Sequence, residues 1–253
     1  MSTNFIEIEH LNKTFGTLEV LKKINLKIEK GKSLVILGGS GTGKSVLIKT
    51  IIGLLRPTRG TIKIDGNNIL DLSHQEKTKF LARCGYLFQG GALFDSLTIE
   101  ENITFFAARL KKLNKKQARD LAIEKLTSVG LQERVLSLYP SELSGGMQKR
   151  AALARTIATE PEIIFFDEPT TGLDPIMSNV INELIVQANK KLGATSITIT
   201  HDMHSARVIA DKIAMLHEGQ IIWEGAKNDL DSADNEYVRQ FISGGAPNAI
   251  YSS

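Results

Sequence analysis

The chain has 253 residues, of which 42% are hydrophobic and 23% charged, a composition typical of a globular protein and not of a disordered, collagen-like or coiled-coil chain. Lysine and arginine exceed aspartate and glutamate by 31 − 28 = 3, an excess too small to indicate a nucleic-acid partner. No apolar run approaches the roughly 20 residues that span a bilayer, residues 1–10 lack a signal-peptide pattern, and the single cysteine cannot form an intrachain disulfide. We therefore expect a cytosolic protein.

Apolar patterning predicts strands of two kinds. Isoleucine or leucine alternates with polar residues at 6–9 and 24–29, which is typical of a strand with one face in water. The segments at 33–37, 163–166 and 195–200 have the form expected of strands that are buried on both faces. Further strands are predicted at residues 61–64, 86–88, 213–216 and 220–224.

Capping residues and stop residues mark the predicted helices. Ser73 begins a capping box, and Asp174 caps a helix that has proline at its first position and ends at Gly193. The segment from 90 to 158 carries two further helix starts, at Thr98 and Asn114, and is predicted to be a mostly helical insert. The predicted helices cover residues 44–55, the regions after 73, 98 and 114, and residues 174–192, 203–210 and 235–242.

The order of these elements predicts an α/β fold with a mainly parallel core sheet, an antiparallel β subdomain at the N-terminus and the helical insert. We expect residues 1–245 to form a single domain, with the helical subdomain at about 90–158. A C-terminal tail follows at 246–253, and we expect it to reach the facing subunit or an accessory protein.

A glycine-rich loop follows the strand at 33–37. It matches the pattern G-x-x-x-x-G-K-[ST], in which glycines allow successive backbone N–H groups to turn inward around phosphate. The lysine supplies a cation to the β- and γ-phosphates, and the last hydroxyl supplies a ligand for Mg²⁺. The loop therefore predicts a nucleotide triphosphate site. Its residues are Gly38, Gly39, Ser40, Gly41, Thr42, Gly43, Lys44 and Ser45.

Two carboxylates, Asp167 and Glu168, end the apolar segment at 163–166. In an open parallel sheet, ligands bind at the carboxyl ends of the strands. We expect Asp167 to hold Mg²⁺ through water and Glu168 to orient or deprotonate the attacking water.

A third motif accompanies the phosphate loop and the two carboxylates. The segment Leu143-Ser144-Gly145-Gly146-Met147-Gln148 resembles the LSGGQ signature of the ABC ATPases, with Met where Gln is usual. The resemblance extends in the family's order from about residue 6 to residue 223. Gln89 resembles the Q-loop glutamine, residues 172–174 the D-loop, His201 the switch histidine, and Phe15 the aromatic residue that stacks on adenine.

The resemblance implies a P-loop ATPase that binds ATP and Mg²⁺ between two copies of the chain, because the phosphate loop and the signature grip one ATP from opposite subunits. A membrane permease would dock on the helical insert. The implied ATP contacts are Phe15, residues 38–45, Ser144, Gly145, Gly146 and Asp174, the implied catalytic residues are Gln89, Glu168 and His201, and the implied Mg²⁺ contacts are Ser45, Gln89 and Asp167.

Finer motifs resemble one group within this family. Residues 89–94, 144–150 and 167–176 are similar to those of the Mla and Mce-associated ATPases, which energise phospholipid movement between bacterial inner and outer membranes. That resemblance implies an Mce-domain substrate-binding protein and a STAS-domain protein as further partners, at the cytoplasmic face of the inner membrane. An ATPase of an amino-acid importer and a soluble iron–sulfur assembly ATPase remain alternatives.

Overall fold

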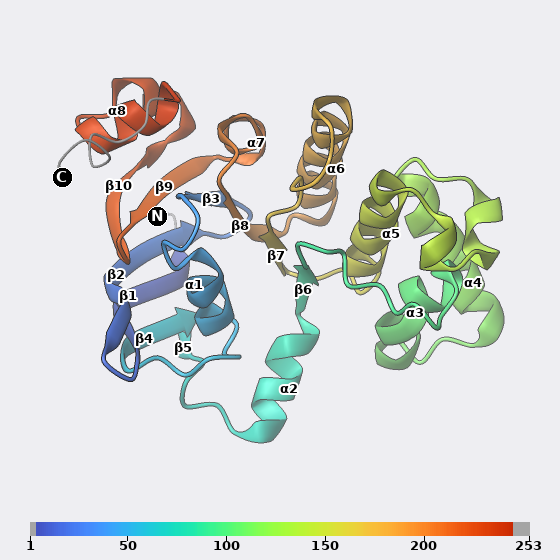
Figure 1. Ribbon diagram of the computed structural model, residues 1–253. Coiled ribbons are helices and arrows are strands. Elements are labelled where there is room, and N and C mark those ends of the chain that lie inside the picture. The colour runs from blue at the N-terminus through green and yellow to red at the C-terminus, as the bar shows by residue number, and fades with distance from the viewer. Residues whose placement is uncertain (1–3, 245–253) are drawn as a thin grey trace. The chain divides into compact units, whose positions relative to one another are not determined.

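The computed structural model describes residues 4–244, and the chain separates into two compact units. The first unit comprises Met1–Asp71 and Ile197–Ser253, and the second comprises Leu72–Ser196. The predicted tail at 246–253 lies outside the described residues. Figure 1 shows the elements in chain order. Within residues 4–244, no helix combines the length and the apolar character needed to cross a membrane.

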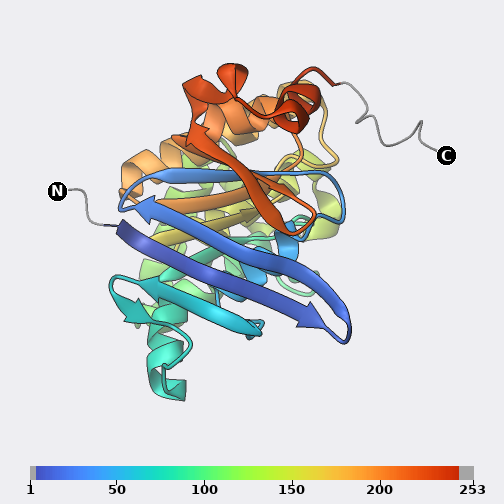
Figure 2. The same ribbon diagram turned by 90° about the vertical axis from the view of Figure 1, so that its left-hand side faces the viewer.

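The first unit contains an antiparallel sheet with the strand order β2-β1-β4-β5 (Figure 2). Its strands are β1 (Asn4–Phe15), β2 (Leu18–Glu29), β4 (Arg59–Ile64) and β5 (Asn67–Asn68). The strands β1 and β2 are longer than the alternating segments predict. Register shifts interrupt their pairing, one of them between Ile8 and Leu11, and a shift of one residue reverses the face on which each later side chain lies.

A second group of strands in this unit confirms the predicted buried, parallel arrangement. The strand β3 (Ser33–Leu37) is buried along its whole length and pairs in parallel with β9 (Lys212–His217). An antiparallel hairpin joins β9 to β10 (Gln220–Ala226) across Glu218 and Gly219, which both have positive φ, as the two central residues of a tight hairpin turn require. From Ile197 onward, β8 (Thr195–Thr200) lies next to β3 in the strand order.

The helices of the first unit are α1 (Lys44–Ile51), α7 (Met203–Ile209) and α8 (Glu236–Ile242), and a 3-10 helix covers Lys227–Ser232. The predicted end of α1 at residue 55 is wrong. The helix ends at Ile51 because Gly53 adopts a left-handed conformation with φ of 75°, which stops the helix before Pro57 is reached.

In the second unit, β6 (Cys84–Leu87) pairs in parallel with the fully buried β7 (Ile163–Asp167). The predicted capping box begins α2, the predicted helix starts at Thr98 and Asn114 also form capping boxes, and Asp174 caps α6 as predicted. The helices are α2 (His74–Ala82), α3 (Ile99–Leu110), α4 (Lys115–Ser128), α5 (Gly145–Ile157) and α6 (Pro175–Leu192), with 3-10 helices η1 (Glu133–Ser137) and η2 (Pro140–Glu142).

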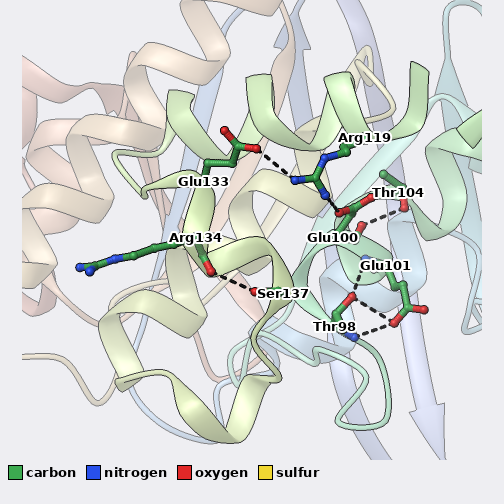
Figure 3. A network of polar contacts seen from close by, with 8 residues as sticks. All are labelled: Thr98, Glu100, Glu101, Thr104, Arg119, Glu133, Arg134 and Ser137. Atoms are coloured by element: carbon green, nitrogen blue, oxygen red, sulfur yellow. Dashed lines mark hydrogen bonds and ion pairs between the residues drawn. The ribbon is translucent and has the colours of Figure 1, made fainter. Parts of the chain in front are cut away.

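Polar contacts join three helices of the predicted insert (Figure 3). Arg119 of α4 donates to Glu100 of α3 at 2.7 Å and to Glu133 of η1 at 3.1 Å. At the start of α3, Thr98 and Glu101 exchange the two hydrogen bonds of a capping box. The insert is therefore fixed at its surface by charge as well as by its apolar core, which includes Ile103, Ala107, Ala122 and Leu126.

Candidate functional site

The glycine-rich loop of the first unit has backbone geometry that other residues resist. Gly41 and Gly43 have φ of 76° and 102°, where an L side chain is strained. At Gly38, a Cβ would lie 2.5 Å from the carbonyl oxygen of Leu216 and 2.8 Å from Thr42 Oγ1. The loop therefore needs glycine for its shape and for its close contact with β9.

Lys44 is the first residue of α1 and is 7% exposed. Its Nζ donates to the carbonyl oxygens of Gly38 and Gly39, each at 2.8 Å, so the ammonium group is held within the loop. The first turn of α1 has neither an acidic side chain nor a side-chain cap. A glycine-rich loop of this shape, a helix N-terminus and a confined cation fit a polyphosphate, which these groups would bind by charge-assisted hydrogen bonds.

Two further predicted residues also lie in the first unit. Phe15 ends β1 with a ring that is 45% exposed, and Lys13 Nζ lies 4.7 Å from its centroid. His201 is exposed and directly follows β8. The next residue, Asp202, caps α7 and accepts hydrogen bonds from the amide and the hydroxyl of Ser205. Burial alone would raise the pKa of Asp202, but these hydrogen bonds outweigh it and lower the pKa, so the cap is anionic at neutral pH.

In the second unit, Asp167 and Glu168 lie at the end of β7 and are 9% and 8% exposed. The Tyr86 hydroxyl donates to Asp167 Oδ2 at 3.1 Å. Burial of Tyr86 and the charge of Asp167 raise the pKa of the tyrosine, so it remains a neutral donor. Glu168 has a left-handed φ of 47°, and its Oε2 accepts from the Thr171 hydroxyl at 3.2 Å. A strained backbone that holds a buried carboxylate is typical of a functional position.

The signature residues lie at the start of α5. Ser144 caps the helix and accepts, at 3.4 Å, from the amide of Met147, and the first turn again has no acidic residue. A Cβ on Gly146 would lie 2.9 Å from the side chain of Met177, so glycine allows α6 to pack closely on α5. Asp174 caps α6 by accepting from the Met177 amide at 3.0 Å. The predicted signature and D-loop residues are therefore neighbours through Met177.

A lysine that the sequence analysis did not select joins the other residues of this unit. Lys149 of α5 donates to the carbonyl oxygen of Gln89 and interacts electrostatically with Asp167 and Glu168. The helical spacing could have identified it, because residues 149, 153 and 156 share the buried face of α5. The positive φ of Glu168 and the hydroxyl contact of Tyr86 could not be recognised in the sequence in this way, because each depends on the folded chain.

The family model described as ABC transporter matches residues 21–171, which include the phosphate loop, the signature and both carboxylates. This chain belongs to the ABC transporter family. It binds and hydrolyses ATP, as members of this family do, and the predicted fold class is confirmed by the solved structures it resembles.

Relatives of this ABC ATPase carry different transport names. It is 41% identical to the "Probable ribonucleotide transport ATP-binding protein mkl" of Mycobacterium leprae, over 94% of this chain and 69% of the relative. It is also 41% identical to the "Intermembrane phospholipid transport system ATP-binding protein MlaF" of Haemophilus influenzae, over 96% of this chain and 92% of that relative. It is 38% identical to the "Methionine import ATP-binding protein MetN" of Ligilactobacillus salivarius, over 96% of this chain and 71% of that relative.

Among solved structures, the ABC ATPase resembles the dimeric ATP-binding cassette MJ0796 in a post-hydrolysis state bound to ADP and phosphate. The TM-score is 0.81 at 33% identity, over 88% of this chain and 98% of that one. The predicted fold therefore agrees with a cassette whose structure was solved together with the products of ATP hydrolysis.

Proposed function

We propose that this ABC ATPase energises the movement of phospholipid between the inner and outer membranes of a bacterium. The observation that carries the proposal is the similarity to the phospholipid transport ATPase MlaF, which extends over 92% of that protein. The stretches at 89–94 and 144–150, which resemble the Mla and Mce-associated ATPases, lie in the second unit, where Lys149 of the second stretch donates to the carbonyl oxygen of Gln89 in the first.

We assign the phosphates of ATP to the loop at 38–45 and the adenine ring to Phe15. The confined ammonium of Lys44 binds the β- and γ-phosphates, and Phe15 is 45% exposed, so its ring is accessible to a base. Oxygen ligands suit Mg²⁺, and the Ser45 hydroxyl, the Asp167 carboxylate and the Gln89 amide provide them. When bound, Mg²⁺ supplies positive charge to the phosphates during hydrolysis.

Hydrolysis requires a group that aligns and deprotonates the attacking water. We assign this role to Glu168, whose carboxylate is buried and is oriented by the Thr171 hydroxyl. His201 contacts the γ-phosphate, and Gln89 orients the water and reports the presence of the γ-phosphate to the helical insert. The negative charge that develops on the γ-phosphate is balanced by Lys44.

The second half of each site comes from another copy of the chain. Ser144 and Gly145 are exposed at the start of α5, and Asp174 is exposed at the start of α6, so the first turns of both helices are open to a partner. The solved relative MJ0796 is a dimer. In the homodimer that we propose, Ser144, Gly145, Gly146 and Asp174 of one chain contact the ATP held by the phosphate loop of the other.

A membrane permease docks on the helical insert in this proposal. Phe105 and Phe106 of α3 are 48% and 55% exposed, and Phe94 packs against Phe105 with a centroid distance of 4.8 Å. Such an apolar surface is typical of a protein–protein contact. The ATPase then lies at the cytoplasmic face of the inner membrane, with an Mce-domain protein and a STAS-domain protein as additional partners.

An amino-acid importer is the second candidate, and the 38% identity to the methionine import protein MetN favours it. The two candidates predict different partners. The discriminating experiment purifies a tagged chain from detergent-solubilised native membranes and measures its ATPase activity with phospholipid or with amino acids. Copurification of an Mce-domain protein, with turnover that depends on phospholipid, would support the proposal.

The Lys44→Ala variant serves as the control, because it should retain the same partners and lose the turnover. Copurification of a soluble amino-acid-binding protein, with stimulation by an amino acid, would contradict phospholipid transport.

A further inference from the structure

Lys149 is a buried cation in the middle of the functional residues of the second unit. It lies on α5, five residues beyond Ser144, and is 7% exposed. Its ammonium donates to the backbone carbonyl oxygen of Gln89. A buried lysine is costly because its charge loses water, so its retention at this position requires a compensating interaction.

A second cation of α5 holds the same loop. Arg155 donates to the carbonyl oxygens of Ala92 and Gly91, at 2.7 Å and 2.8 Å. A Cβ on Gly91 would lie 3.3 Å from the Cβ of Ala152, so the loop backbone also packs directly on the helix. The segment that begins with Gln89 is therefore attached to the helix that carries the signature serine at its start.

The two cations differ in their surroundings. Burial lowers the pKa of Lys149, and the negative charges of Asp167 and Glu168 oppose that shift. Burial also lowers the pKa of Arg155, but no carboxylate contributes there. Lys149 is thus the cation of α5 that both supports Gln89 and interacts with the two acids at the end of β7.

We propose that Lys149 is a positioning residue for ATP hydrolysis, whose ammonium fixes the Gln89 backbone to the signature helix and balances the charge of Asp167 and Glu168. The inference rests on the roles proposed above for those three residues. It predicts that the loss of the Lys149 charge slows the chemical step and leaves ATP binding largely intact, because the phosphates are assigned to Lys44 and the loop at 38–45.

The test compares three variants of the full-length chain by steady-state ATPase kinetics and thermal unfolding. Lys149→Met keeps an unbranched side chain of similar bulk, one heavy atom shorter, and removes the charge, so folding should be preserved. We expect kcat to fall about tenfold, because small displacements of catalytic groups are costly, while KM for ATP changes by less than about twofold. Lys149→Arg restores a cationic donor and should recover kcat to within about threefold of the original value.

Arg155→Gln is the matched control, because it weakens the attachment of the same loop without removing a charge beside the carboxylates. It should lower the unfolding midpoint more than Lys149→Met does and lower kcat less. If kcat falls in proportion to thermal stability across all three variants, Lys149 is only a structural support and the proposal is overturned. Unchanged kcat in Lys149→Met overturns it as well.

Glu168→Gln, measured in parallel, separates this inference from the proposed function. Loss of turnover in Glu168→Gln together with normal turnover in Lys149→Met overturns the role of Lys149 alone. Normal turnover in Glu168→Gln overturns the catalytic assignment and this inference with it.

Discussion

The helices α1 and α5 both begin at a glycine-rich motif, yet their N-termini are built differently. The cap of α1 is Gly43 in a left-handed conformation, without a side-chain hydrogen bond, and the next residue, Lys44, is buried. The cap of α5 is Ser144 in an extended conformation, its hydroxyl accepts from the amide of Met147, and it is exposed. The first N-terminus thus belongs to a preformed loop, whereas the second is satisfied by its own serine and open at the surface.

In the homodimer proposed above, this difference would allow two helix N-termini to share one nucleotide. A preformed loop can bind phosphate within a single chain, because its glycine conformations and the position of Lys44 are already set. The exposed start of α5 is capped by its own serine, so it contributes to phosphate binding only when the phosphate replaces or joins the contact between the Ser144 hydroxyl and the Met147 amide. Substitutions at the two termini should therefore have separable effects on ATP binding and on turnover.

The largest loss of turnover is expected from a substitution of Glu168, which belongs to neither helix N-terminus. Glu168→Gln keeps the size of the side chain and removes the base, so turnover should fall by about 10²-fold or more. Binding of Mg²⁺–ATP should persist, and the chain should accumulate as an ATP-bound dimer when that nucleotide is present. ATPase rates measured beside size-exclusion profiles test both statements, and near-normal turnover would mean that another residue positions the water.

At the first terminus, Lys44→Ala removes the cation held by the carbonyl oxygens of Gly38 and Gly39. Charge-assisted hydrogen bonds contribute about 1.5–3 kcal/mol, so the affinity of the monomer for ATP should fall by roughly 10- to 150-fold. Isothermal titration with ATP measures this change. Equal affinity in the variant and the original chain would exclude the loop as the phosphate site.

At the second terminus, Ser144→Arg blocks the exposed start of α5. The affinity of the monomer for ATP should change by less than about twofold, because the phosphate loop is untouched, whereas turnover should fall at least about tenfold. The same titration and an ATPase assay report the two quantities. A loss of monomer affinity as large as that of Lys44→Ala would show that both termini act within one chain.

Phe15→Ala is expected to cause the smallest change, a modest loss of affinity for ATP. Aromatic stacking contributes about 0.5–1.5 kcal/mol, which corresponds to an affinity loss of roughly two- to tenfold. Titration with ATP and with inorganic triphosphate tests the assignment, because only the nucleotide has a base to stack. An equal loss for both ligands would mean that Phe15 does not contact adenine.

The sequence predicted the parts of the fold that depend on local chemistry. The caps at Ser73, Thr98, Asn114 and Asp174 all begin helices, because each offers a side-chain oxygen to the free amides of a first turn. The hairpin turn at Glu218 also follows from its own residues and the glycine after it. Features that depend on a neighbouring segment were harder to predict.

The length of β1 depends on register shifts against β2, and the early end of α1 depends on the conformation that Gly53 adopts. The predicted site residues were recognisable one by one, since glycine, lysine and carboxylate patterns are local. Their supporting contacts were not, because Lys149 and Gln89 lie 60 positions apart along the chain. Such long-range contacts are determined by tertiary packing, which a single sequence does not reveal.

The helix α5 also limits where this chain can change in length. One residue inserted after Gly146 would rotate every later side chain by about 100° and translate it by about 1.5 Å along the axis. Lys149 and Arg155 would then point away from the carbonyl groups they hold, although every amino acid of the original helix would still be present. An insertion in the exposed connection between α3 and α4 at residues 111–114 would leave the register of α5 unchanged, so this connection is a better place for a spliced tag.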